Sequence, residues 1–218
     1  MIVVVGLAAY SATADGQGTA AGPAVDVSAE AARRGAAVEL VGKVGDDGAG
    51  EAVVLALGRL GIGHSALLRD PARPTPVLAV DDAAETTGVD VDDLPVASLL
   101  PADPERRPIL EPGDVQLAIR YLAEARVVVV ADPLADAALK AAVEGAQFAA
   151  ARLVVLVAAG STVPDLPAEA TVLEAPAADD GSFARVVGAF AAALDSGLDA
   201  EAAFAAAVEK SGWEPVAD

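Results

Sequence analysis

Short apolar runs alternate with amphipathic segments from the start of the chain. Residues 2–5 form a continuous apolar run that ends at Gly6, which is typical of a strand buried on both faces. A helix is expected over about residues 23–34, because proline suits its first turn, and the next apolar run covers residues 36–41. Apolar side chains at helical spacing predict a second helix over about residues 49–60. This βαβα order predicts a parallel sheet with right-handed crossovers.

The same alternation continues to the last residues. Further strands are expected at 65–69, 75–80, 127–130, 153–157 and 171–173, and further helices at about 114–125, 134–151, 182–195 and 200–210. Residues 81–113 are acidic and proline-rich without a sustained period, so we expect an irregular insertion there. No internal repeat is visible. The pattern predicts one domain over residues 1–218, of α/β class, with helices on both faces of a mostly parallel sheet.

Charge and composition exclude several functions. The formal net charge is −19, from 33 acidic and 14 basic residues, which repels nucleic acid and anionic membrane surfaces. The absence of cysteine excludes disulfides and thiolate catalysis, and a single histidine excludes multi-histidine metal sites. We predict no metal ligands. No apolar run approaches about 18 residues, and the opening run is too short for a signal peptide, so we expect a cytoplasmic protein.

The strongest candidate site is the stretch from Gly42 to Gly50, where glycines and carboxylates follow a strand and precede a helix. Glycines such as Gly45 permit a tight turn and close approach of a ligand. Asp46 and Asp47 can cap the helix or accept hydrogen bonds from sugar hydroxyls. Lys43 is placed to face the same corner. An ordinary strand-to-helix turn explains one glycine and one aspartate, but it does not explain all the glycines and carboxylates of this stretch.

Two other helix starts carry candidate groups. Asp26 follows Gly22 in the first turn of a helix, either as a helix-start acid or as a hydrogen-bonding group for a polyhydroxy ligand. Residues 179–182, Asp-Asp-Gly-Ser, are read either as a helix cap or as an anion site made by free N–H groups. The glycines over residues 16–22 do not make a dinucleotide fingerprint, because ten residues separate Gly6 from the first of them.

Residues 22–50 resemble the N-terminal signature of the ribokinase-like (PfkB) carbohydrate kinases, including its Val-Gly-x-Val-Gly-x-Asp-x-x-Gly motif at 41–50. Residues 74–76 and 187–203 are similar to later segments of that family. The resemblance implies a three-layer α/β/α ribokinase-like fold, ATP and Mg²⁺ as cofactors if the protein is active, and a sugar or nucleoside as ligand. The substrate positions implied or proposed are Ser11, Gly22, Asp26, Lys43, Gly45, Asp46 and Asp47, with Gly181 and Ser182 for the nucleotide.

The chain also departs from that family. The segment before Gly22 is short for the family's β lid, so we expect a reduced or absent lid, and the chain lacks residues between about 157 and 181. The family's catalytic Gly-Ala-Gly-Asp aligns with residues 181–184, which places Ala184 where the general base should stand. An alternative alignment sets Pro176 and Asp179 against the family's Asn-x-x-Glu and removes the catalytic motif altogether.

Three interpretations follow from these departures. The first is a degenerate kinase homologue that keeps part of a ligand corner but phosphorylates weakly or not at all. The second is an active carbohydrate kinase that uses Asp179 or Asp180 as a displaced base, with Asp180 as the catalytic candidate. The third is a non-catalytic ligand-binding or regulatory protein, a homodimer joined through edge strands near residues 75–80.

Overall fold

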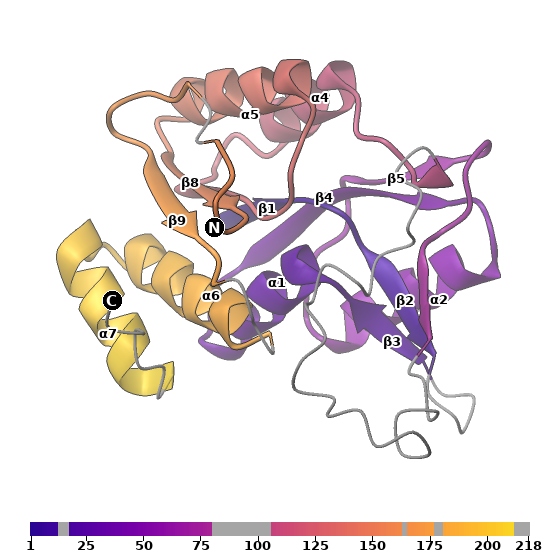
Figure 1. Ribbon diagram of the computed structural model, residues 1–218, viewed down its shortest axis with the longest axis horizontal. Coiled ribbons are helices and arrows are strands. Elements are labelled where there is room, and N and C mark those ends of the chain that lie inside the picture. Colours follow the sequence, from indigo (N-terminus) through magenta and orange to yellow (C-terminus); the bar gives the residue numbers. More distant parts are fainter. Residues whose placement is uncertain (13–17, 80–105, 163–164, 177–180, 212–218) are drawn as a thin grey trace.

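A six-stranded parallel sheet forms the centre of the molecule, as a computed structural model shows (Figure 1). The structure describes residues 1–12, 18–79, 106–162, 165–176 and 181–211. The strand order is β5-β4-β1-β7-β8-β9, and every neighbouring pair is parallel. The strands are β1 (Ile2–Val5), β4 (Val38–Gly45), β5 (Leu67–Asp70), β7 (Val127–Val130), β8 (Arg152–Val157) and β9 (Thr171–Glu174).

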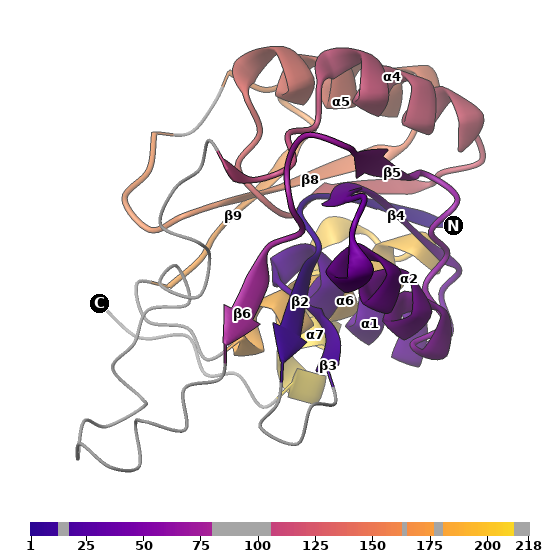
Figure 2. The same ribbon diagram turned by 90° about the vertical axis from the view of Figure 1, so that its right-hand side faces the viewer.

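Helices cover both faces of this sheet (Figure 2). One face carries α4 (Pro112–Tyr121) and α5 (Asp136–Phe148). The other carries α1 (Pro23–Arg33), α2 (Gly48–Arg59) and α6 (Ser182–Asp195), and α7 (Ala200–Ser211) packs against α6. The expected three-layer α/β/α fold with a parallel sheet is confirmed.

Strict alternation of side chains along the central strands divides the core into two halves. In β1, Ile2 and Val4 pack with α1 and α6, whereas Val3 and Val5 pack with α4 and α5. All four side chains of β1 are fully buried because the strand lies between β4 and β7 and under helices on both sides. Continuous apolar runs such as residues 2–5 are therefore the expected pattern for these strands.

A small second sheet, in the order β3-β2-β6, lies beside the large one (Figure 2). It contains β2 (Ala9–Ala12), β3 (Gly18–Ala21) and β6 (Val77–Ala79); β2 is antiparallel to β3 and parallel to β6. Strands β2 and β3 are not among the strands that the sequence pattern predicts. The lid-like sheet that the resemblance led us to expect as reduced or absent is present in this three-stranded form.

Two of the boundaries that differ from the sequence-based expectation bear on the site or on the expected insertion. Strand β4 continues to Gly45, so residues 42–45 belong to the strand and the turn to α2 is confined to Asp46 and Asp47. Helix α4 begins at Pro112, inside the expected irregular insertion at 81–113, most of which lies outside the described residues. None of the helices in the described part of the chain is long and apolar enough to cross a membrane.

Candidate functional site

The sheet order places a topological switch point between β1 and β7. From β1 the chain crosses to β4 on one side, and β7 lies on the other side. In open α/β sheets, ligands bind in the crevice outside the carboxyl ends of the strands at such a point. Here those ends carry Gly6 and Leu7 after β1, and Asp132 after β7.

Asp132 is the most unusual titratable group at this point. Its carboxylate accepts a hydrogen bond from the Leu7 backbone N–H, with 2.9 Å between Leu7 N and Asp132 Oδ2. Only 8% of the residue is exposed. A side chain at Gly6 would collide with Asp132 Oδ2 and with the Ala24 side chain, so glycine is required there. Strand β1, strand β7 and the start of α1 therefore meet around one carboxylate.

Burial raises the pKa of Asp132 to about 6. The Leu7 N–H and the positive charge of Arg107 oppose this rise, whereas the negative charge of Asp26 adds to it. Asp26 and Arg107 therefore lie close enough to Asp132 to interact with it electrostatically. A buried carboxyl group at a strand end whose pKa is raised toward neutral pH is typical of functional sites.

Two of the predicted ligand residues, Gly22 and Asp26, lie at this switch point. Gly22 has φ = 111°, which favours glycine, and it precedes Pro23 at the start of α1. Asp26 stands in the first turn of α1 and is exposed. The positive end of the helix dipole stabilises its charge, so a negative group is held beside the crevice.

Asp47 is held by internal hydrogen bonds. Its side chain caps α2 by accepting from Gly50 N at 2.8 Å, and it also accepts from Thr75 N at 2.8 Å and Thr75 Oγ1 at 2.7 Å. Thr75 Oγ1 in turn accepts from Gly45 N at 2.8 Å. Burial opposes ionisation of Asp47, but the hydrogen bonds from Gly50 and Thr75 hold its pKa below the usual range. A ligand contact by Asp47 stays a prediction, beside this structural role.

The other predicted residues of the Gly42–Gly50 stretch have separate surroundings. Lys43 Nζ lies 2.8 Å from Asp114 Oδ2 of α4, in a partly buried ion pair. A side chain at Gly45 would meet Thr75 N at 2.5 Å and Arg73 O at 2.9 Å, so the turn before β6 packs directly on this glycine. Asp46 is exposed. Ser11 lies in β2 of the small sheet, opposite Thr19 and Leu78.

The predicted nucleotide side lies at the start of α6. Gly181 occupies the N-cap in a left-handed conformation (φ = 83°), and as a glycine it has no side chain with which to cap the helix. Phe183 and Ala184 are buried, and the first turn of α6 contains no acidic residue. The candidate base Asp180 lies outside the described residues, as does Asp179. Among the residues that the structure describes, no three His, Cys, Asp or Glu side chains converge on a metal position.

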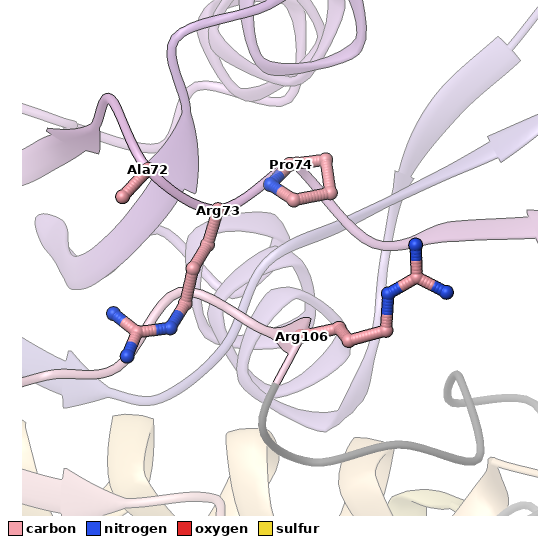
Figure 3. A pocket seen from close by; sticks show the side chains of 4 residues that line it. All are labelled: Ala72, Arg73, Pro74 and Arg106. Carbon is pink, nitrogen blue, oxygen red and sulfur yellow. The ribbon is translucent and has the colours of Figure 1, made fainter.

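Some candidate residues were missed from the sequence. Asp132 directly follows the apolar run 127–131, and the strand-end argument used for Gly42–Gly50 could have found it. Arg73 and Arg106 could not have been found in this way. With Ala72 and Pro74 they line a hollow of about 430 Å³ (Figure 3), yet they are separated in the sequence by residues 74–105.

Comparison with solved structures decides which fold this is. A ribokinase from Arabidopsis thaliana, complexed with ribose and ATP, superposes with a TM-score of 0.64 over 96% of this chain and 90% of its own, at 16% identity. The chain has the ribokinase-like fold. An aminoimidazole riboside kinase from Salmonella enterica gives a TM-score of 0.56 over 96% and 90% at 16% identity. A protein from Staphylococcus aureus that is described as a phosphofructokinase gives a TM-score of 0.61 over 97% of this chain and 90% of its own, at 14% identity.

No protein-family model and no curated protein matches the chain. At these identities the structural likeness establishes the ribokinase-like fold alone. The activity has to be argued from the residues of the site.

Proposed function

We propose that this ribokinase-like protein binds a small polyhydroxy compound, a sugar or a nucleoside, and has weak or no phosphotransferase activity. The proposal of weak or absent phosphotransferase activity rests on the first turn of α6. That turn contains no carboxylate, and its Phe183 and Ala184 are buried. Phosphoryl transfer to a hydroxyl needs a group that accepts the hydroxyl proton and donors that stabilise the transferred phosphoryl group. Buried phenyl and methyl groups supply neither.

The proposal that the protein binds a polyhydroxy ligand rests on the carboxylates of Asp132 and Asp26. It also rests on the close approach of Gly22 to the backbone of Leu7. Carboxylates are good acceptors for sugar hydroxyls. Asp132 is oriented by the Leu7 N–H, and a Cβ built on Gly22 would lie 3.4 Å from Leu7 O, so the backbone around the crevice is close-packed. The neighbour from Arabidopsis thaliana is a ribokinase complexed with ribose, which supports a ligand of this chemical class.

Among the described residues, no three His, Cys, Asp or Glu side chains come together to hold a cation. We therefore derive no catalytic step through ATP. If the protein is active, ATP with Mg²⁺ remains the cofactor that the fold family implies.

A panel of sugars and nucleosides tests the proposal in two assays. In thermal unfolding, at least one compound should raise the midpoint, because a ligand at 100 times its Kd adds about 2.7 kcal/mol of stability. The Asp132→Asn variant should lose this shift. In an assay coupled to ADP release, none of the binders should turn over. ATP-dependent phosphorylation at about 1 s⁻¹ or faster, the lower end of normal enzyme rates, would contradict the assignment.

The second candidate is an active carbohydrate kinase with Asp180 as a displaced base. The observation that favours it is that α6 begins at Ser182, directly after Asp180 and Gly181 in the sequence, because backbone N–H groups at a helix N-terminus bind phosphate. It predicts Mg²⁺-dependent ATP binding and turnover that Asp180→Asn abolishes. A calorimetric titration with ATP and Mg²⁺ that shows no heat removes this candidate.

A third candidate is a regulatory homodimer joined through the small sheet. Strand β6 is an edge of that sheet in the part of the chain described, and half of the Val77 side chain is exposed there. Unpaired edges are the usual place for strand addition. A molar mass in solution that stays monomeric up to about 100 μM, well above the Kd of a stable dimer, would remove it.

A further inference from the structure

The helices α4 and α5 carry the most exposed large apolar residues in the described part of the chain. Leu117 and Tyr121 on α4 are 71% and 76% exposed, and Phe148 at the end of α5 is 69% exposed. Single exposed apolar residues are common on protein surfaces and need no explanation. Three of them on two neighbouring helices indicate a surface that another molecule covers.

These three residues belong to one continuous layer of the molecule, the α4–α5 layer (Pro112–Tyr121 and Asp136–Phe148). Leu117 and Tyr121 are four residues apart, so they lie on the same face of α4. The two helices lie side by side on one face of the large sheet (Figure 1). They approach closely at Gly145, where a Cβ would lie 2.8 Å from Ile119 Cγ2. Phe148 follows about one helical turn after this contact.

The charge of this part of the chain differs from that of the rest. Residues 106–152 contain six basic and six acidic side chains, so their formal net charge is zero. The net charge of −19 therefore comes entirely from the remaining residues. Both signs are exposed in the layer: Glu124 follows Arg120 by four residues, and Glu144 follows Lys140 by four, with 4.0 Å between Lys140 Nζ and Glu144 Oε1.

This charge distribution favours a second copy of the same chain as the molecule that covers the layer. Two copies that each carry −19 repel each other, and the repulsion is weakest when the neutral layers meet and the acidic surfaces stay apart. In a twofold contact the same patch lies on both sides, so it has to complement itself. Apolar side chains flanked by both charge signs meet this requirement, because the bases of one copy can face the acids of the other. A basic partner would be drawn to the acidic part of the surface instead.

The layer is large enough for such a contact. Leu117, Tyr121 and Phe148 together expose on the order of 400 Å² of apolar surface. A stable interface buries about 800 Å² on each partner. The exposed polar residues of the same two helices, such as Gln116 and Gln147, can supply the remaining area as a polar rim.

A contact through this layer leaves the strand-end crevice open. Helix α4 begins beside the strand ends, because Asp114 in its first turn lies 2.8 Å from Lys43 near the end of β4. The helix then runs away from these ends, and Tyr121 is its last residue before the chain turns back into β7. Phe148 likewise ends α5 shortly before β8 begins at Arg152. The exposed apolar residues therefore lie away from the crevice.

We propose that two copies of this chain associate through the α4–α5 layer and bury Leu117, Tyr121 and Phe148 between them. This contact differs from a dimer joined through β6, because the small sheet lies well apart from α4 and α5 (Figure 2). The inference does not depend on which ligand the protein binds or on whether it transfers a phosphoryl group.

Sedimentation equilibrium between about 1 and 100 μM tests the proposal. The wild type should reach twice the mass of one chain in this range. Tyr121→Ser and Leu117→Ser should each raise the dissociation constant at least about tenfold, because buried apolar anchors dominate the energy of an interface. The matched control is Leu55→Ser, which removes an exposed leucine from α2 and should leave the dissociation constant unchanged.

A pair of charge variants tests whether the partner is a second copy. Arg120→Glu combined with Lys140→Glu leaves the exposed layer acidic, and Glu124→Lys combined with Glu144→Lys leaves it basic. Neither variant should self-associate, because like charges would face each other, but an equimolar mixture of the two should form a heterodimer. Thermal unfolding of each variant should stay close to that of the wild-type monomer, since all four residues are exposed.

Three results would overturn the inference. The first is a wild type that remains monomeric at about 100 μM. The second is a dimer that Val77→Asp dissociates and Tyr121→Ser does not, which would place the contact at the edge strand β6. The third is a mixture of the two charge variants in which no heterodimer forms. Each of these outcomes leaves the proposed ligand binding at Asp132 untouched.

Discussion

Asp132 has a stability cost that follows from its position. The carboxyl group has a pKa of about 6 in the folded protein, against 3.8 for an unperturbed side chain. Between these two values the folded state binds more protons than the unfolded state. Stability therefore falls as the pH rises through this window, and a shift of this size corresponds to about 3 kcal/mol above it. A buried carboxylate kept at such a cost is consistent with a functional role.

Asp132→Asn should therefore stabilise the protein more at pH 7.5 than at pH 4.5, by about 2 kcal/mol. The amide oxygen can still accept the Leu7 N–H, and it carries no buried charge. Chemical denaturation of both proteins at the two pH values measures the difference. The exposed Asp136 at the start of α5 supplies the control, Asp136→Asn, which should show no such pH dependence. An equal effect of Asp132→Asn at both pH values would show that burial does not raise its pKa.

Asp47 and Asp46 are adjacent carboxylates with different expected effects. Asp47→Ala removes the cap of α2 and both acceptors of Thr75, so it should lower the free energy of unfolding by about 2–4 kcal/mol. Asp46→Ala should cost less than about 0.5 kcal/mol, because Asp46 is exposed. Because the pKa of Asp47 is lowered, its contribution is present above pH 4 and is lost as the pH falls further. Urea denaturation at pH 7 measures the free energy of unfolding of both variants. Equal losses of stability in the two variants would contradict the role assigned to Asp47.

At the scale of elements, the packing of α6 on α1 depends on the absence of a side chain at Gly188. A Cβ there would lie 2.5 Å from Val27 O and 2.7 Å from Glu30 Cβ. Both contacts belong to α1, whose start carries Gly22 and Asp26. The distance between these helices therefore influences the position of the ligand-facing turn.

Gly188→Ala should lower stability by about 1–3 kcal/mol, because two backbones must move apart to admit a methyl group. Gly113→Ala is the matched control, since a Cβ at that helical position meets nothing within 4 Å and alanine favours the helix. Thermal unfolding compares them. A stabilising Gly188→Ala would contradict the close approach of α1 and α6.

Elements with a strong local period were predictable from the sequence, and elements made by distant pairing were not. Strand β7 and helix α6 have the predicted bounds, because four consecutive valines and a helical apolar stripe identify them locally. Strands β2 and β3 consist mostly of small residues and show no β pattern. Strand β3 pairs only with β2, and β2 also pairs with β6, which follows more than 50 residues later in the chain. Asp132 comes close to Leu7 and Asp26 only through the sheet order, which residue spacing does not contain.

The molecule as a whole carries strong negative charge. A formal charge of −19 on 218 residues opposes the compact state through self-repulsion, which salt screens over about 10 Å at 0.1 M. The positive charge of Arg107, which acts on Asp132 at the end of β7, is a local exception. The net negative charge of the protein repels an anionic ligand at long range, so such a ligand has to be recognised through short-range contacts.

Raising sodium chloride from about 20 mM to about 300 mM should raise the unfolding midpoint by a few degrees, because screening weakens the repulsion. Differential scanning calorimetry measures it. A midpoint that falls as the salt concentration rises would show that attractive ion pairs outweigh the repulsion.

The central place of β1 has a consequence for the time course of folding. Ile2 pairs with Val127, so one side of β1 has no partner until the ribosome has made more than half of the chain. At about 5–20 residues per second, translation of the intervening segment takes about 6–25 s. During that interval a strand of four apolar residues is open to other nascent chains or to chaperones. Sheets of this kind fold slowly because distant segments must meet, and the yield of native protein should therefore depend on chaperone supply during synthesis.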